Sequence, residues 1–105
     1  MQCTTVLKYW LHIVAIIWRR STDKHGIVHE DPVHAILFSF ARVDKFDEPR
    51  LLGHNALTLF LGPGRERDII LEVMVEILDS GDVSVFHVME ARQKIVTLVE
   101  EMRNR

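Results

Sequence analysis

Residues 65–80, RERDIILEVMVEILDS, decide the fold of this chain because their apolar side chains fit two different periods. With the 3.6-residue period of a helix, the acidic side chains form one stripe and almost every other position is large and apolar. The members of this stripe are Asp68, Glu72, Glu76 and Asp79. With the two-residue period of a strand, the segment DIILEVMVEIL alternates acceptably as well. We predict a helix over about 65–80 that ends at Gly81 and lies at the centre of the molecule.

The residues that commonly start and stop helices support the helical interpretation elsewhere. Asp31-Pro32 combines an N-cap acceptor with a proline suited to a first turn, and apolar side chains recur at helical spacing behind it. We therefore predict a second helix over about 32–45. The run DEP at 47–49 repeats this start chemistry, and the Gly-Pro pair at 62–63 is a stop signal. A further helix is expected between them.

Both ends of the chain also carry helical patterns. A helix over about 4–20 follows from polar residues spaced by three and four, and the two arginines at its end suit the helix dipole. A last helix, capped by Asp82 or Ser84, is expected to run to about residue 103. Its apolar residues form a short heptad-like seam: Val88, Ala91, Ile95, Leu98 and Met102.

An α+β fold is the alternative, because three other segments are rich in residues that favour strands. These segments are VHAILFSFARV (33–43), NALTLFLG (55–62) and DVSVFHVME (82–90). In this alternative a small sheet and two C-terminal helices would form from strand–helix units at 56–80 and 83–104. The agreement between helix start and stop residues and helical periodicity decides between the two. We predict an all-α fold, a compact bundle of about five helices, with residues 1–105 as a single helical domain.

The composition is that of an ordinary globular protein and argues against several classes of function. The formal net charge is −2, and the basic residues do not cluster, so nothing indicates binding to nucleic acid. The single cysteine, Cys3, can form neither an internal disulfide nor a zinc framework, which favours a reducing, cytoplasmic setting. The apolar run at 6–18 is shorter than the roughly 20 residues that a membrane-spanning helix needs.

The segment HGIVHEDPVH, residues 25–34, gathers three histidines and two acids and raises the question of a metal site. Such a site needs three or four ligands that converge on one point. Gly26 and the β-branched residues after it disfavour a helix that would bring His25 and His29 together, and Asp31 is expected to cap the second helix. We interpret the segment as a surface loop into that helix, and we expect neither a metal nor a cofactor.

Motifs for nucleophilic catalysis or phosphate binding do not stand out. The segment GPGR at 62–65 lacks the spacing of a phosphate-binding loop and is expected to form a tight turn between helices. The remaining hypothesis for an enzyme is acid–base chemistry on the α+β alternative, with His54 or His87 as the partner of Glu72 or Glu76.

The function that we predict is protein–protein interaction, most simply self-association as a homodimer. The first and fourth helices would be apolar over most of their circumference, and a chain of 105 residues has little interior in which to bury both. The expected contact residues are Trp10, Trp18, Val88, Ile95, Leu98 and Met102. Glu72 and Glu76 are expected to form a charged rim around them. A further alternative is a peripheral membrane protein anchored by the first helix.

Overall fold

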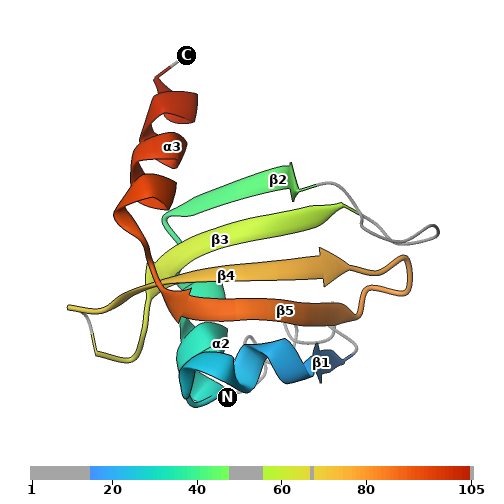
Figure 1. The fold of residues 1–105 in the computed structure, drawn as a ribbon. Coiled ribbons are helices and arrows are strands. Elements are labelled where there is room, and N and C mark those ends of the chain that lie inside the picture. Colours follow the sequence, from blue (N-terminus) through green and yellow to red (C-terminus); the bar gives the residue numbers. More distant parts are fainter. Residues whose placement is uncertain (1–14, 48–55, 67, 105) are drawn as a thin grey trace, which may run out of the picture.

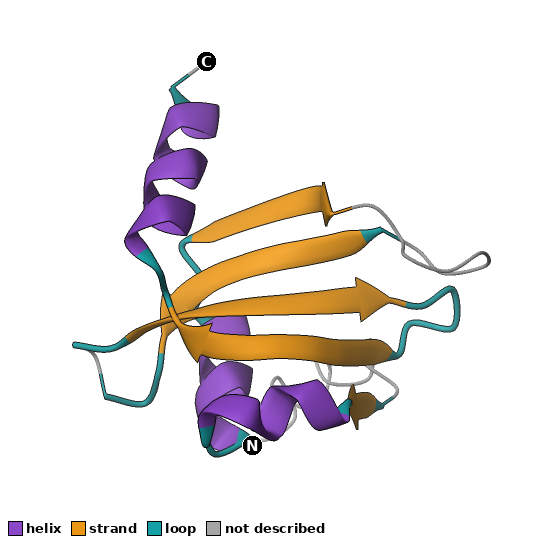
Figure 2. Cartoon of the chain, in the orientation of Figure 1, coloured by secondary structure: helices purple, strands orange, loops and turns teal. Residues whose placement is uncertain are grey.

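The computed structural model describes residues 15–47, 56–66 and 68–104. Its main element is a five-stranded sheet with one α-helix on each face (Figures 1 and 2). The prediction of an all-α bundle is therefore wrong, and the α+β alternative is confirmed.

The described elements comprise five strands, one 3-10 helix and two α-helices. In chain order they are β1 (Ile16–Trp18), the 3-10 helix η1 (Arg20–His25), α2 (Glu30–Leu37), β2 (Ala41–Asp47), β3 (Leu57–Pro63), β4 (Ile70–Ile77), β5 (Val83–Glu90) and α3 (Gln93–Arg103). The strands lie in the order β1-β5-β4-β3-β2. The pairs β2–β3, β3–β4 and β4–β5 are antiparallel, whereas β1 pairs in parallel with β5. Among the described residues, β1 and β2 are therefore the two edges of the sheet.

Strand β4 occupies the segment for which the helix over 65–80 was predicted, and its glutamates explain the error. Glu72 and Glu76 are four residues apart, and a spacing of four fits one face of a helix as well as one face of a strand. The β-branched Val73, Val75 and Ile77 fit the pleated surface of a sheet and lose side-chain freedom in a helix. Pairing with β3 on one side and β5 on the other completes the hydrogen bonds of the β4 backbone.

The helix predicted over 32–45 begins close to the expected place but is much shorter. α2 starts at Glu30, and Pro32 lies in its first turn, where the missing N–H costs nothing. The helix ends at Leu37, and the chain turns into β2. The apolar residues that continued the helical pattern after Leu37 belong to this strand and its approach.

The other predicted helices are corrected in the same direction, from helix to strand. β3 occupies the end of the helix predicted between 47 and 62, and β1 and η1 occupy the described part of the helix predicted over 4–20. The helix predicted to begin at Asp82 or Ser84 is divided into β5 and α3. In the α+β alternative, the second strand–helix unit matches β5 and α3, whereas the first corresponds to two strands, β3 and β4.

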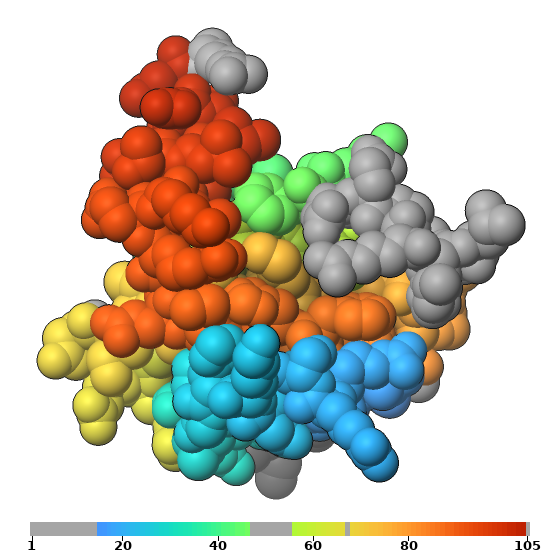
Figure 3. All heavy atoms as spheres, in the orientation of Figure 1, coloured from blue at the N-terminus to red at the C-terminus, as the bar shows by residue number. Residues whose placement is uncertain are grey.

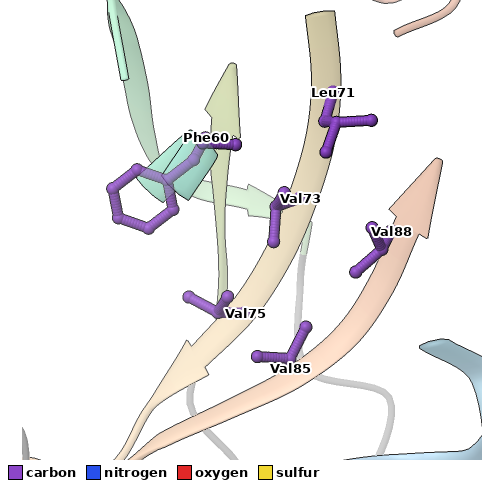
Figure 4. Packing of buried hydrophobic residues seen from close by; sticks show 7 residues of the cluster. Phe60, Leu71, Val73, Val75, Val85 and Val88 are labelled. Atoms are coloured by element: carbon purple, nitrogen blue, oxygen red, sulfur yellow. The ribbon is translucent and has the colours of Figure 1, made fainter. Parts of the chain in front are cut away.

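The larger hydrophobic core lies between the sheet and α2, which packs on β3 and β4. Its buried members are Ala35, Phe60, Leu71, Val73, Val75, Val85 and Val88 (Figure 4). The helix comes so close that a Cβ at Gly62 would lie 2.1 Å from the carbonyl oxygen of Ala35. Only glycine permits this approach, so Gly62 is a packing residue of β3 and not the predicted end of a helix.

A smaller core lies on the opposite face, because successive residues of a strand point to opposite sides of a sheet. Leu59 and Leu61 of β3 contact Ile95 and Val99 of α3 there. Beyond this contact, α3 rises away from the sheet and projects from the molecule as a column (Figures 1 and 3). The two helices therefore differ in how much of their surface the sheet covers.

Candidate functional site

Glu72 is the centre of a polar cluster beneath the start of α3, and its side chain has no exposed surface. Its Oε1 accepts hydrogen bonds from Arg92 Nη2 at 2.7 Å and Nε at 2.9 Å, and lies 2.8 Å from His87 Nε2. Its Oε2 accepts the backbone N–H of Arg92 at 2.9 Å. Both carboxylate oxygens thus have donors, which is the condition under which a buried charge is tolerated.

The protonation state of this cluster follows from its contacts. Burial acts to raise the pKa of Glu72, but the hydrogen bonds from Arg92 and His87 outweigh this and hold the pKa below its ordinary value. Glu72 is therefore ionised at neutral pH. Because an ionised carboxylate only accepts hydrogen bonds, Nε2 of His87 is the donor in this contact. The His87 side chain keeps 27% of its surface exposed.

A β-bulge in β5 brings His87 to Glu72. Val75 pairs with Val85 and Met74 pairs with His87, so Phe86 is an extra residue without a partner in β4. Val85 faces the core under α2, and strict alternation would turn His87 to that same side. The extra residue turns it to the side of Glu72 instead, which is a common effect of such bulges.

Arg92 links the cluster to α3 because it is the residue that immediately precedes the helix. Its backbone N–H and its guanidinium both bind Glu72, so the start of α3 is tied to the middle of β4. Sequence reasoning missed Arg92, since nothing in the local pattern around it indicates a buried partner twenty residues earlier. The predicted pairing of His87 with Glu72 is present in the structure, and His54 lies outside the described residues.

Glu76, the second glutamate predicted for the charged rim, is buried as well, at 2% exposure. It lies on the same side of β4 as Glu72, opposite Ser84 of β5. Four residues along a strand separate the two glutamates by about 13 Å, so they do not form a pair of carboxylates that could share one proton. Their burial also removes them from any surface rim.

Trp18, predicted as a contact residue, packs within its own chain. Its ring stacks on the ring of His29 with centroids 3.9 Å apart and planes 9° from parallel. His29 in turn lies 3.0 Å from Asp23 through its Nε2. His25 points elsewhere, with its ring edge-to-face with that of His87 at 6.0 Å.

The segment at 25–34 leads into α2 as expected, but Asp31 does not cap the helix. Asp31 instead accepts hydrogen bonds from the backbone N–H of Arg65 at 3.1 Å and from its Nε at 2.8 Å. The hydrogen bond from the Arg65 side chain lowers the pKa of Asp31. The tight turn predicted at 62–65 is not confirmed as such: β3 continues to Pro63, and of these residues only Gly64 and Arg65 lie in the connection to β4. Arg65 contacts α2 through Asp31. Beside it is a hollow of about 480 Å³ with Ile69 and Met89 in its wall.

A groove between β2 and α3 is the second candidate region, and we call it the β2–α3 face. It has a volume of about 400 Å³ and is lined by Phe40, Ala41, Arg42, Val43, Asp44, Val99, Met102 and Arg103. Phe40 is 50% exposed and Met102 40%. Leu98, one turn before Met102, is 39% exposed. Sequence reasoning missed the β2 part of this face because residues 41–47 were assigned largely to a helix.

The remaining predicted contact residues divide between the interior and the surface. Val88 and Ile95 are buried in their own chain, at 1% and 7% exposure, so they are not available to a partner. Leu98 and Met102 are exposed, and Trp10 lies outside the described residues. Of the predicted set, the structure therefore brings only Leu98 and Met102 together on an open surface.

Comparisons of the chain with protein-family models, with curated proteins and with solved structures gave no match. Within residues 15–47, 56–66 and 68–104, no three histidine, cysteine or acidic side chains gather as a metal site would require. In the same part of the chain, none of the helices has the length and apolar character needed to cross a membrane.

Proposed function

We propose that this protein is a self-association module whose interface is the β2–α3 face. The observation that carries this proposal is the exposure of Leu98 and Met102 on a helix that projects beside an edge strand. One of the two segments predicted to form apolar helices is strand β4, so it offers no helix surface to a partner. The proposal now rests on α3 and on the strand next to it.

The limited attachment of α3 is the first physical argument for a partner. The helix has 11 residues, a length at which an isolated helix is marginal in water, and only Ile95 and Val99 are buried. Most helical stability in proteins comes from packing an apolar face. A partner that covered Leu98 and Met102 would extend the packed face of α3 by a further turn.

The apolar surface available on this face is the second argument. Phe40 and Met102 of this face are 50% and 40% exposed, and Leu98, one turn before Met102 on α3, is 39% exposed. Removing apolar surface from water contributes about 25 cal/mol for each Å² buried. Exposed backbone groups of the edge strand and the charged Arg42 and Asp44 would supply a polar surround, as in other protein interfaces.

Sedimentation of the protein over a concentration series tests the proposal. We expect a dimer to form in the micromolar range, and the double variant L98Q/M102Q to remain monomeric at concentrations where the unmodified protein is dimeric. The matched control is V28Q, because Val28 is 51% exposed but lies outside the β2–α3 face. A protein that stays monomeric at several hundred micromolar, or a V28Q effect as large as that of L98Q/M102Q, would contradict the proposal.

A second candidate function is proton transfer by His87, favoured by its 2.8 Å contact with the buried Glu72. A carboxylate that accepts from one ring nitrogen fixes the tautomer and supports a proton on the other nitrogen. Glu72 has no exposed surface and would act only as a positioning residue. Turnover in a substrate screen should disappear in H87A and fall in E72Q; activity retained by H87A excludes this candidate.

Two expectations from the sequence stay predictions. The reducing, cytoplasmic setting follows from the cysteine content alone, and localisation of a tagged chain would test it. The membrane anchor depends mainly on residues before Ala15, and flotation with liposomes would test it. Protein that remains at the bottom of the gradient would exclude the anchor.

A further inference from the structure

In the part of the chain that the structure describes, β2 is the last strand at one side of the sheet and supplies the strand of the β2–α3 face. An edge strand presents backbone N–H and C=O groups that can pair with another strand, and proteins often block such edges with bulges or charges. In β2, the irregular backbone that would hinder pairing with another strand is confined to the second half. Lys45 has a left-handed backbone, with φ of 54°, and the register with β3 shifts between Val43 and Asp47. From Ala41 to Val43 the pairing with β3 is regular.

Two opposite charges lie on one face of β2, with Arg42 in the regular part and Asp44 directly after it, where the register begins to shift. Arg42 and Asp44 are joined by a hydrogen bond of 2.9 Å, and their side chains are 52% and 65% exposed. The Arg42 guanidinium lies over the ring of Phe60, which faces α2, so this pair is on the α2 side of the sheet. Val43, between them, belongs to the opposite side and packs with the core under α3.

We propose that two copies of this chain join through antiparallel pairing of β2 with β2 about a two-fold axis at Val43. The inference rests on the proposed self-association and specifies its geometry. Arg42 of one copy then lies opposite Asp44 of the other, and the symmetry repeats this pair. The two sheets become one continuous sheet. The two α3 helices then lie on the same face of this joined sheet, one from each copy. A two-fold interface of this kind is self-complementary by construction.

Charge selects this register over its neighbours. A two-fold axis at Arg42 would place two arginines directly opposite each other. An axis at Asp44 would place two aspartates directly opposite each other. Like charges in these positions destabilise a sheet. A shift of one residue in the pairing would instead turn Val43 toward the side of the charged residues. Only the axis at Val43 gives two opposite-charge pairs and keeps both valines beside α3.

The helices explain why a second copy, and not an unrelated strand, is the occupant that fits. The groove beside Val43 is lined by Met102 and Phe40, and Leu98 is exposed on the same helix. A bare peptide strand would satisfy the backbone edge but would leave these side chains in water. A second copy brings its own α3 to the same face of the joined sheet. Each helix would then cover the exposed apolar residues of the other.

Two charge-reversal variants test the register. R42D carries only negative charge at positions 42 and 44, and D44R carries only positive charge. We expect each variant alone to dimerise at least tenfold more weakly than the unmodified protein, since like charges would face each other twice. An equimolar mixture should form a heterodimer of nearly unmodified affinity, because every cross-strand pair is then opposite in charge. Native mass spectrometry identifies the heterodimer, and circular dichroism checks that both variants are folded.

The outcomes separate the register from the proposed function. If the unmodified protein is monomeric, both the proposed self-association and the β2 register are contradicted. If it dimerises, and L98Q/M102Q disrupts the dimer but R42D and D44R do not, the face is correct and the β2 pairing is wrong. If both charge variants are monomeric and their mixture does not associate, the register at Val43 is overturned. If the protein is monomeric but binds an added peptide strand along β2, the second copy is the wrong occupant.

Discussion

The two helices of this protein are attached to the same sheet in different ways. α2 lies against the central strands, with Ala35 completely buried and its carbonyl oxygen against Gly62. α3 touches the sheet with Ile95 and Val99 and is held at its start by the bonds between Arg92 and Glu72. α2 is thus fixed by close apolar packing. α3 is fixed by the hydrogen bonds between Arg92 and Glu72, which we call its polar anchor, and by the apolar contact of Ile95 and Val99.

This difference shows which part of the molecule can serve a partner. α2 buries Pro32 and Ala35 against the sheet, and its apolar surface is open only near its C-terminal end, where Leu37 is 52% exposed. A helix that is anchored at one end leaves its far turns exposed, and in α3 these turns carry Leu98 and Met102.

Loss of the polar anchor should have the largest effect. E72A removes a carboxylate with no exposed surface and leaves Arg92 and His87 without their acceptor. Removing one partner of a buried ion pair commonly costs 3–5 kcal/mol, and we expect about 3 kcal/mol because Arg92 can turn toward water. Urea unfolding measures the loss. An effect below about 1 kcal/mol would mean that the apolar contact alone holds α3.

Close packing of α2 should be the next most sensitive feature. In G62A the new Cβ would meet the carbonyl oxygen of Ala35 at 2.1 Å, so α2 must move. Forced repacking of a core costs about 1–3 kcal/mol. The control is G64A, whose Cβ would have its nearest neighbour at 3.8 Å, an ordinary contact. Equal stability of the two variants would show that the sheet can adjust to α2 without cost.

Acid should weaken the anchor of α3 before it affects the packing of α2. The pKa of Glu72 in the folded protein lies below its ordinary value of 4.5. Its stabilising contribution is therefore complete above the unfolded pKa and is lost as the pH falls through the lower folded pKa. In E72Q this part of the pH dependence should be absent, while that of Asp31, also lowered, remains. Parallel stability curves for E72Q and the unmodified protein between pH 5 and pH 2 would contradict the assignment.

The exposed turns of α3 should contribute least to the stability of a single copy. M102Q changes a side chain that is 40% exposed, and surface changes of this kind usually stay within about 0.5 kcal/mol. Unfolding must be measured at a concentration where the protein is monomeric, because dimerisation adds to apparent stability. The buried counterpart V99A should lose clearly more. A larger loss in M102Q than in V99A would show that α3 packs differently.

The helix signals of the sequence were reliable only over a few residues. Pro32 correctly indicated the first turn of α2, and the strand–helix division at 83–104 was present in the α+β alternative. The repeat of Glu72 and Glu76 fits both periods, so the spacing of these acidic residues does not distinguish a strand from a helix. The β-branched residues between the glutamates favoured the strand, and they deserved more weight than helix caps elsewhere.

Some features of the site could not be predicted because they join distant parts of the chain. Glu72 meets Arg92 only after β4 and β5 have paired, and His87 meets it only because of the bulge at Phe86. The position of β2 at the edge is likewise a consequence of strand order. None of these relations leaves a periodic pattern in the residues involved.

By itself, the sequence determined where apolar segments lie and approximately where α2 starts. Local sterics and hydrogen bonding act over a few residues, and such signals can be read directly from the chain. Only the tertiary structure decided that the glutamates are buried and that Leu98 and Met102 are exposed. Burial depends on which strand pairs with which and on how far each helix lies along the sheet, and both are set by long-range contacts.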